Sequence, residues 1–458
     1  MATTSLYRAT DGSTTTTFTW SGWVKRSRLG VAQGLCYNQK DDSVTNQRWR
    51  LQFTGSDTLN FENKNSAGED DVYLDTNQKF RDTSAWYHIV LVYDTTQAET
   101  DRVKIYINGE SVEDNGGWGV TNRASADFTT NWSSGWEHYI GKMVDDSAAN
   151  YFFDGVMAHV HCTYGTAYQA SAFGETDATS GIWVAKTSPS VTYGSQGYFL
   201  KFASGASTTD SSGEGNTMTQ AGTMTTTKDT PDNNFATWNP LYKSDYAGQN
   251  APIYGNTGWI SAETSTNYPT YCSTLGVTTG KWYFETYIQA DSESTSGLTM
   301  GIADGSKQST YLGDLDTDYV YYGNTGVTFN GGTGTAYGAT LAVGDILGCA
   351  VDLDNLKIYW SKNGVWQNSG DPTSGATGTG SAYTMTAPSL TNTGVYMLAT
   401  GDSGNANTPT CYTNFGNGYF GTTAVTSAEA DGNGEGQFEY APPTGYFALC
   451  TNNLGSES

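Results

Sequence analysis

Two stretches of the chain alternate apolar and polar residues with a period of two. Residues 103–107 read Val-Lys-Ile-Tyr-Ile, and residues 356–360 read Leu-Lys-Ile-Tyr-Trp. A period of two predicts a β-strand with one buried and one wet face. Each stretch is preceded by an apolar run and followed by Asn-Gly, at Asn108-Gly109 and Asn363-Gly364. Because Asn-Gly supplies the positive-φ residues of a tight turn, each region predicts an antiparallel hairpin.

A hairpin with one apolar face has to be covered by a second sheet, so each half of the chain predicts a β-sandwich. The 55 Gly and 31 Tyr, together with abundant Thr, Ser and Asn, also favour an all-β architecture. Residues 203–231 contain hardly any large apolar side chain, which is typical of a linker or surface excursion. We therefore predict a first sandwich at 1–162, a connector at 163–228 and a second sandwich at 229–454.

The first half resembles a laminin-G-like concanavalin A domain, and the second half resembles a SPRY domain. The first resemblance is carried by residues 18–24, 86–94, 104–109 and 153–160. The second is carried by residues 280–285, 300–303, 344–348, 356–360 and 363–364. Both resemblances imply concanavalin A-like antiparallel sandwiches of jelly-roll type.

The combination of the two halves resembles structural proteins of marine phages. The carriers are the connector and the motifs that open and close the second half, at residues 171–177, 181–183, 197–202, 210–216, 229–241 and 440–454. One departure is Thr163-Tyr-Gly-Thr166, where such proteins show an Asp-Gly turn. The resemblance covers nearly the whole chain and implies a role in a virion.

Charge and cysteine usage exclude several classes of function. With 46 acidic against 22 basic residues, a net charge of −24, the chain lacks the clustered cations that nucleic acid and anionic membranes require. No stretch approaches the about 20 apolar residues of a membrane span, and residues 1–20 do not resemble a secretory signal. The six cysteines form no Cys-x-x-Cys or zinc spacing. We expect a reduced protein made in the host cytoplasm.

Aromatic residues in Gly-, Ser- and Asn-rich surroundings suggest a platform for sugar rings, because exposed aromatics on loops often mark binding sites. The alternative interpretation is packing in the core or between subunits. The candidate carbohydrate-binding residues are Trp118, Trp132, Trp136, Tyr319, Tyr321 and Tyr322.

The sequence offers fewer signals for catalysis or metal binding than for carbohydrate binding. Glu429-Ala-Asp-Gly-Asn-Gly-Glu435 has the carboxylate spacing of some concanavalin A-like glycosidases, but its glycines are unfavourable in a strand. His159 and His161 lie two apart on a predicted strand and lack an identifiable third ligand. Laminin-G-like domains often bind Ca²⁺ at one rim, and residues 69–71 and 145–146 are acidic clusters. We assign no metal ligands.

We expect a non-enzymatic virion surface protein: a tail fibre, capsid fibre or decoration protein that adheres to host-surface polysaccharide. Its expected partners are other capsid or tail proteins and a host glycan, and a homotrimer fits the symmetry of phage fibres. Three alternatives remain open: a purely structural capsid or tail component, a polysaccharide depolymerase and a bacterial cell-surface adhesin, the last disfavoured by the missing signal peptide.

Overall fold

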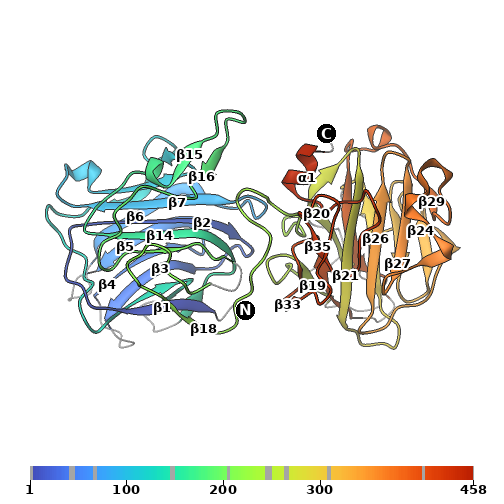
Figure 1. Ribbon diagram of the computed structural model, residues 1–458, viewed down its shortest axis with the longest axis horizontal. Coiled ribbons are helices and arrows are strands. Elements are labelled where there is room, and N and C mark those ends of the chain that lie inside the picture. Colours follow the sequence, from blue (N-terminus) through green and yellow to red (C-terminus); the bar gives the residue numbers. More distant parts are fainter. Residues whose placement is uncertain are drawn as a thin grey trace. The chain divides into compact units, whose positions relative to one another are not determined.

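The chain folds into two compact units, residues 1–226 and 227–458 (Figure 1). The computed structural model describes residues 4–40, 47–64, 70–144, 150–203, 207–242, 250–261, 268–306, 311–404 and 408–456. Each unit contains two large antiparallel sheets. The predicted fold class, two all-β antiparallel sandwiches, is confirmed.

Unit 1 is built from an eight-stranded and a six-stranded sheet. In spatial order, the eight-stranded sheet consists of β10 (Trp118–Asn122), β6 (Asp70–Lys79), β5 (Thr58–Lys64), β4 (Arg48–Phe53), β3 (Gln33–Lys40), β11 (Trp136–Ile140), β1 (Ser5–Thr10) and β18 (Thr219–Ala221). The six-stranded sheet consists of β17 (Tyr198–Leu200), β14 (Gly155–Tyr164), β2 (Thr17–Arg26), β7 (Tyr87–Asp94), β8 (Val103–Ile107) and β9 (Glu110–Ser111). Smaller elements are the pairs β12 (Lys142–Val144) with β13 (Asn150–Phe152) and β15 (Gly174–Thr176) with β16 (Trp183–Ala185), and the 3₁₀ turns η1 (Glu99–Asp101) and η2 (Ala170–Ala172).

Unit 2 is built from a seven-stranded and a six-stranded sheet. The first consists of β19 (Gly258–Ile260), β31 (Thr410–Asn414), β21 (Lys281–Ala290), β26 (Ile346–Asp352), β27 (Lys357–Lys362) and β28 (Val365–Trp366), with β29 (Tyr383–Thr384) also paired to β27. The second consists of β20 (Thr270–Val277), β30 (Tyr396–Asp402), β22 (Leu298–Ala303), β23 (Tyr319–Tyr322), β24 (Val327–Asn330) and β25 (Thr333–Ala336). Smaller elements are β32 (Tyr419–Phe420) with β33 (Thr423–Ala424), β34 (Glu429–Ala430) with β35 (Gln437–Phe438), η3 (Gln367–Ser369), η4 (Pro372–Thr377), η5 (Pro388–Leu390) and α1 (Thr451–Ser456). No helix among the described residues is long and apolar enough to cross a membrane.

The two predicted hairpins form, and they share one stabilising device. In β7–β8 of unit 1, the backbone N–H of Asn108 donates to the His88 carbonyl (2.9 Å), and the Asn108 side-chain oxygen accepts from the His88 N–H (2.8 Å). In β26–β27 of unit 2, Asn363 makes the same pair of bonds with Ile346, both at 2.8 Å. Each asparagine has a positive φ, 50° and 49°, which asparagine tolerates better than most residues.

The segment expected to be a connector, residues 163–228, belongs to unit 1 as far as Thr226. Strand β17 extends the six-stranded sheet beside β14, and β18 extends the eight-stranded sheet beside β1. Tyr198, Leu200 and Met218 of this segment pack in the core of unit 1. Its low apolar content suggested a linker, but a few large side chains and backbone pairing are enough to hold an edge strand.

Additional segments cover the outer face of one sheet in each unit. In unit 1, outward-facing Val90 and Val92 of β7 pack against Ala170 and Phe173 of the region around η2. In unit 2, outward-facing Tyr283 and Tyr359 of the seven-stranded sheet pack against a C-terminal segment that includes Phe438, Tyr446 and Ala448. The sheet concerned is therefore shielded from water on both faces.

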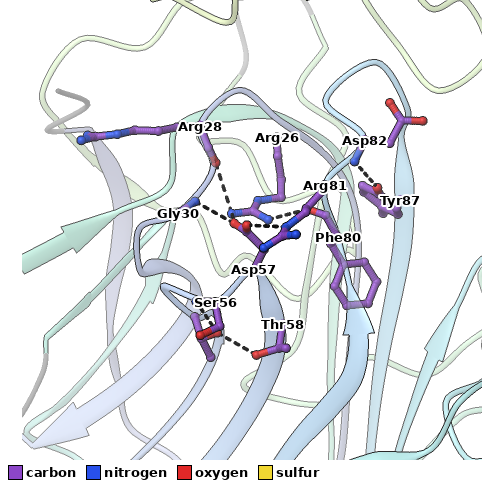
Figure 2. A network of polar contacts seen from close by, with 11 residues as sticks. Arg26, Arg28, Gly30, Ser56, Asp57, Thr58, Phe80, Arg81, Asp82 and Tyr87 are labelled. Atoms are coloured by element: carbon purple, nitrogen blue, oxygen red, sulfur yellow. Dashed lines mark hydrogen bonds and ion pairs between the residues drawn. The ribbon is translucent and has the colours of Figure 1, made fainter. Parts of the chain in front are cut away.

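A buried ion-pair network joins the two sheets of unit 1 at one end (Figure 2). Arg26, at the end of β2, donates to Asp57 Oδ1 (3.1 Å) and to the Phe80 carbonyl (2.5 Å). Asp57, in the β4–β5 turn, also accepts from the Gly30 N–H (2.8 Å) and from Arg81 Nε (3.0 Å). Burial alone raises the pKa of Asp57, but these hydrogen bonds and ion pairs hold it below its usual value.

Replacing Asp57 by Asn is expected to lower the free energy of unfolding by about 3 kcal/mol, because the Arg26 guanidinium is left buried without a counter-charge. Asn tolerates the positive φ of 66° at this position, so the substitution tests the charge rather than the backbone. Urea unfolding of the whole chain at neutral pH measures the loss. Because the folded pKa of Asp57 is depressed, its contribution is present at neutral pH, and the difference between wild type and variant narrows only below about pH 4.

The matched control is Arg81→Ala, which removes a cation that is 54% exposed and leaves the Arg26–Asp57 pair in place. We expect it to cost less than about 1 kcal/mol. Equal losses for the two variants would contradict the account of a buried, essential pair.

Candidate functional site

The outer face of the eight-stranded sheet in unit 1 carries polar and aromatic side chains. Strand β4 reads Arg-Trp-Arg-Leu-Gln-Phe, and Trp49, Leu51 and Phe53 lie in the core between the sheets. The alternation of a strand therefore puts Arg48, Arg50 and Gln52 on the opposite face. Strand β5 repeats the pattern, with Leu59 and Phe61 inside and Asn60, Glu62 and Lys64 outside.

The register of seven neighbouring strands aligns one such residue from each into a continuous row, which we call the outer row. Side chains directly opposite each other in antiparallel strands share a face. From β1 to β10 the outer row consists of Tyr7, Tyr139, Tyr37, Arg50, Glu62, Tyr73 and Asn122.

Glu62 lies at the centre of a charged cluster within the outer row. It accepts from Arg50 Nη2 (2.7 Å) and Arg48 Nε (3.2 Å), and Lys64 Nζ lies 3.9 Å away. The Glu62 side chain is only 2% exposed. A carboxylate that is almost fully buried and paired with cations is not accessible to a substrate, so this cluster stabilises the sheet.

A hairpin covers the β1–β3 side of the outer row. Met143 and Val144 of β12 and Tyr151 of β13 pack against Tyr37 and Tyr139. Arg50 Nη1 also donates to the Val144 carbonyl (3.4 Å). The centre of the outer row is therefore shielded from solvent.

The opposite end of the outer row is open at the β6–β10 edge. Tyr73 and Asp75 of β6 are half-buried, and Asn122 of β10, opposite Tyr73, is exposed. Oδ1 of Asp75 is buried and has no hydrogen-bond partner among the described residues, and burial raises the pKa of this carboxyl. An aromatic ring beside an unsatisfied carboxylate oxygen and an amide is suited to binding a polyhydroxylated ligand. We call Tyr73, Asp75 and Asn122 the edge site.

The prediction that Trp132 and Trp136 form an exposed aromatic platform in unit 1 is wrong. Trp132 and Trp136 are 0% and 3% exposed. Trp132 packs against Phe18 and Trp49 in the core, and its Nε1 donates to Thr130 Oγ1 (3.2 Å). Trp118 is half-buried against the same core, and its Nε1 donates to Glu113 (2.9 Å). The Gly- and Ser-rich segment around Trp132 indicated an exposed loop, but the indole fills the core and has no face free for a sugar.

The tyrosines predicted in unit 2 are also buried. All three lie on β23, with exposures of 3% for Tyr319, 0% for Tyr321 and 8% for Tyr322. Their hydroxyls are satisfied internally: Tyr319 donates to Thr386 Oγ1 (3.2 Å) and Tyr322 to the Leu312 carbonyl (2.7 Å). Tyr321 donates to the Ala339 carbonyl. Tyr319 and Tyr321 belong to the main hydrophobic core of unit 2 and Tyr322 to a smaller buried cluster, so none of the three forms an exposed platform.

One serine–histidine pair has the spacing of a nucleophile and its base. Ser21 Oγ lies 2.8 Å from His88 Nε2. However, His88 Nδ1 accepts from Trp183 Nε1 (2.9 Å), so the ring hydrogen is on Nε2 and is donated to Ser21. This polarity is the reverse of the one that activates a serine, in which Nδ1 donates to a carboxylate. Burial also lowers the pKa of His88 to about 3.

The carboxylates at 429–435 do not converge on a cleft. Glu429 is exposed, whereas Asp431 is buried and accepts from the Ala448 N–H and from Asn453 Nδ2, both at 2.9 Å. Glu435 accepts from Asn233 Nδ2 (2.7 Å). Two of the three therefore have structural partners.

No group of three or more metal-ligating side chains occurs within the described part of the chain. His161 accepts or donates a bond with the Tyr193 hydroxyl (2.9 Å) and stacks on Phe199, and a register shift between Ala158 and His161 interrupts the alternation that paired it with His159. Glu69, Asp145 and Asp146, from the acidic clusters considered for Ca²⁺, lie outside the described residues.

Unit 2 contains a buried carboxylate with a strongly shifted pKa. Glu285 of β21 is 0% exposed and accepts from the backbone N–H groups of Glu439 (2.9 Å) and Tyr440 (2.8 Å) and from the Tyr283 hydroxyl (3.0 Å). Burial raises its pKa to about 7, although these three bonds favour the charged form. Because its partners are mainly backbone groups, Glu285 anchors the C-terminal segment and does not face a substrate.

Comparison with known proteins identifies a domain in each unit. Residues 2–171 match the concanavalin A-like lectin/glucanases superfamily in its laminin-G form, and residues 281–397 match the SPRY domain. The chain therefore contains a laminin-G-like concanavalin A domain followed by a SPRY domain.

Several curated relatives share part of this chain. Ran-binding protein 9 of Danio rerio is 31% identical over 138 residues, which cover 28% of this chain and 22% of the relative. The Mus musculus protein of the same name is 32% identical over 138 residues, covering 28% and 20%. The match spans about a fifth of the length of these relatives. Among solved structures, the SPRY domain of human HERC1 is 13% identical with a TM-score of 0.29, covering 38% of this chain and 96% of that chain.

The raised pKa of Glu285 predicts a pH dependence of unit 2. A carboxyl whose folded pKa lies above its unfolded value contributes stability that is complete in acid and is lost as the pH rises through about 7. We expect the free energy of unfolding of unit 2 to fall by about 2–3 kcal/mol between pH 5 and pH 8 from this group.

Differential scanning calorimetry of the whole chain at both pH values, on wild type and Glu285→Gln, measures the effect. The variant is expected to be less stable at pH 5, because an amide cannot accept both backbone N–H groups, and to show a smaller pH dependence. An unchanged pH dependence in the variant would show that Glu285 does not titrate in this range.

Proposed function

We propose that this protein is a non-enzymatic surface component of a phage particle, and that its concanavalin A-like domain adheres to host-surface polysaccharide through the edge site. A tail fibre, a capsid fibre and a decoration protein are the kinds of virion protein that fit this proposal. Its partners in this proposal are other virion proteins and, by analogy with symmetric fibres, further copies of the same chain in a homotrimer.

The edge site is the observation that carries the adhesion proposal. Sugar hydroxyls donate to carboxylate oxygens, and the half-buried carboxyl of Asp75 is such an acceptor. Its buried Oδ1 has no partner among the described residues, so a sugar that displaces the neighbouring side chains would give this oxygen its first hydrogen bond. The half-buried ring of Tyr73 offers an apolar surface with a hydroxyl at its end, and Asn122 offers an amide beside it. The surrounding domain matches a superfamily named for lectins and glucanases, which supports a carbohydrate as the ligand.

The phage assignment rests on the sequence resemblance of residues 171–177, 181–183, 197–202, 210–216, 229–241 and 440–454. The net charge of −24 is consistent with a soluble surface component that does not bind nucleic acid. Three observations support a non-enzymatic role. His88 donates its hydrogen to Ser21 and so does not activate this serine, and Glu62 is paired with arginines. Asp431 and Glu435 accept hydrogen bonds from neighbouring groups of the fold.

The test is binding of the purified full chain to a glycan array and to whole bacterial cells. Asp75→Asn removes the charged acceptor and keeps the side-chain shape, so we expect a loss of affinity of about ten- to a hundredfold. Tyr73→Ala is expected to produce a comparable loss by removing the ring.

The matched control is Asp114→Asn, which removes an equal charge from an exposed turn after β9 and should bind like wild type. Retained binding in folded Asp75→Asn and Tyr73→Ala would exclude the edge site. A folded wild-type protein that binds no glycan and no cell would favour the structural capsid or tail component instead.

A further inference from the structure

A short hairpin lies over the outer face of the six-stranded sheet without joining it. We call residues 170–186 the strap; it contains η2, β15 and β16. Strands β15 and β16 pair only with each other, and they lie beside β7 in Figure 1. The strap packs on outward-facing residues of the sheet, Trp23 of β2 and Val90 and Val92 of β7.

One side chain tethers this hairpin to the sheet. Trp183 Nε1 donates to His88 Nδ1 (2.9 Å), and the two rings stack with centroids 6.0 Å apart. The His88 ring stacks on Trp23 as well, at 4.8 Å. Among the described residues, every other hydrogen bond of residues 174–185 stays within the strap. The hairpin is therefore attached through a single hydrogen bond and the contacts of Trp183 and Ala185, while Ala170 and Phe173 at the start of the strap pack on Val90 and Val92.

Two glycines make room for that indole. A Cβ at Gly174 of β15 would lie 2.5 Å from the Trp183 ring, and a Cβ at Gly109, in the β8–β9 turn, would lie 2.6 Å from it. Both distances are shorter than carbon atoms tolerate, so the closed position of Trp183 requires glycine at both places.

Closure also leaves one polar group unsatisfied. Trp23 is 4% exposed, packs in one cluster with Trp183 and Ala185, and its Nε1 has no hydrogen-bond partner among the described residues. A buried donor without a partner favours any state in which water reaches it. The strap thus gains one hydrogen bond with His88 while it sequesters the N–H of Trp23.

We propose that the strap is a lid that opens as a local unit while the six-stranded sheet stays folded, and that its opening uncovers the aromatic face formed by Trp23 and His88. The hairpin lacks the backbone pairing that would make it cooperative with the sheet, which places it at the low-stability end of unit 1. The inference is independent of the edge site, which lies on the other sheet.

Hydrogen–deuterium exchange of the full chain, followed by mass spectrometry, tests the lid. In wild type, peptides from the strap are expected to exchange at least about ten times faster than peptides from β2 and β7. Trp183→Phe keeps an aromatic ring at this position but removes the N–H that donates to His88, so strap exchange should accelerate roughly three- to tenfold, with β2 and β7 unchanged.

Gly174→Ala is a second, independent variant for this test, because the added methyl collides with the Trp183 ring. The φ of Gly174 is not positive, so alanine introduces no backbone strain there. It is expected to accelerate strap exchange in the same way. Ile182→Ala, at the 63% exposed tip of the hairpin, is the control and should change nothing. Strap and sheet exchanging at one common rate, or accelerating together in Trp183→Phe and Gly174→Ala, would overturn the proposal, as would no change of strap exchange in either variant.

Discussion

A charged side chain buried in a sheet costs free energy unless it meets partners, and much of this molecule follows from that constraint. Arg26, Glu62 and Glu285 all lie where water does not reach, and each meets a defined set of partners. Leaving any of them unpaired would cost several kcal/mol, so the partners specify the geometry around them. The Arg26–Asp57 pair fixes how the two sheets of unit 1 meet at one end, and Glu285 fixes the course of the C-terminal segment over unit 2.

The two units share one hydrogen-bonding arrangement in their hairpins, but different segments pack on the outer faces of their sheets. In both hairpins, β7–β8 and β26–β27, the asparagine of the Asn-Gly turn that follows the second strand binds the backbone of the first strand, at His88 and at Ile346. In unit 1 the six-stranded sheet is covered by the strap, whereas in unit 2 the seven-stranded sheet is covered by residues near the C-terminus. On the eight-stranded sheet, the β12–β13 hairpin covers the β1–β3 side of the outer row, whereas Asn122 at its β10 end is exposed. The placement of Tyr73, Asp75 and Asn122 is a consequence of which faces the other segments occupy.

Burial also explains why two arrangements that resemble parts of catalytic sites do not face a substrate. Ser21 and His88 lie at the right distance, but an indole rather than a carboxylate contacts the far nitrogen of the ring. Glu285 has a pKa near neutrality, but backbone N–H groups occupy its oxygens. A shifted pKa or a short contact indicates function only when the group also faces a space that a substrate can enter.

The sequence by itself determined the all-β class, the two sandwiches and the positions of both hairpins, because alternation and Asn-Gly turns are local signals with a direct physical cause. The same alternation in β4 and β5 could have located Arg48, Arg50 and Glu62 on one face. Only the tertiary structure decided that these residues join tyrosines from β1, β3 and β11 in one row, since strand order and register depend on contacts between distant segments. It also decided that Trp132, Trp136 and the tyrosines of β23 are buried, and that residues 163–226 complete the sheets of unit 1. The local composition of a segment indicates where the chain turns. The burial of its side chains depends on which distant segments pack over it, and this is decided only when the whole chain has folded.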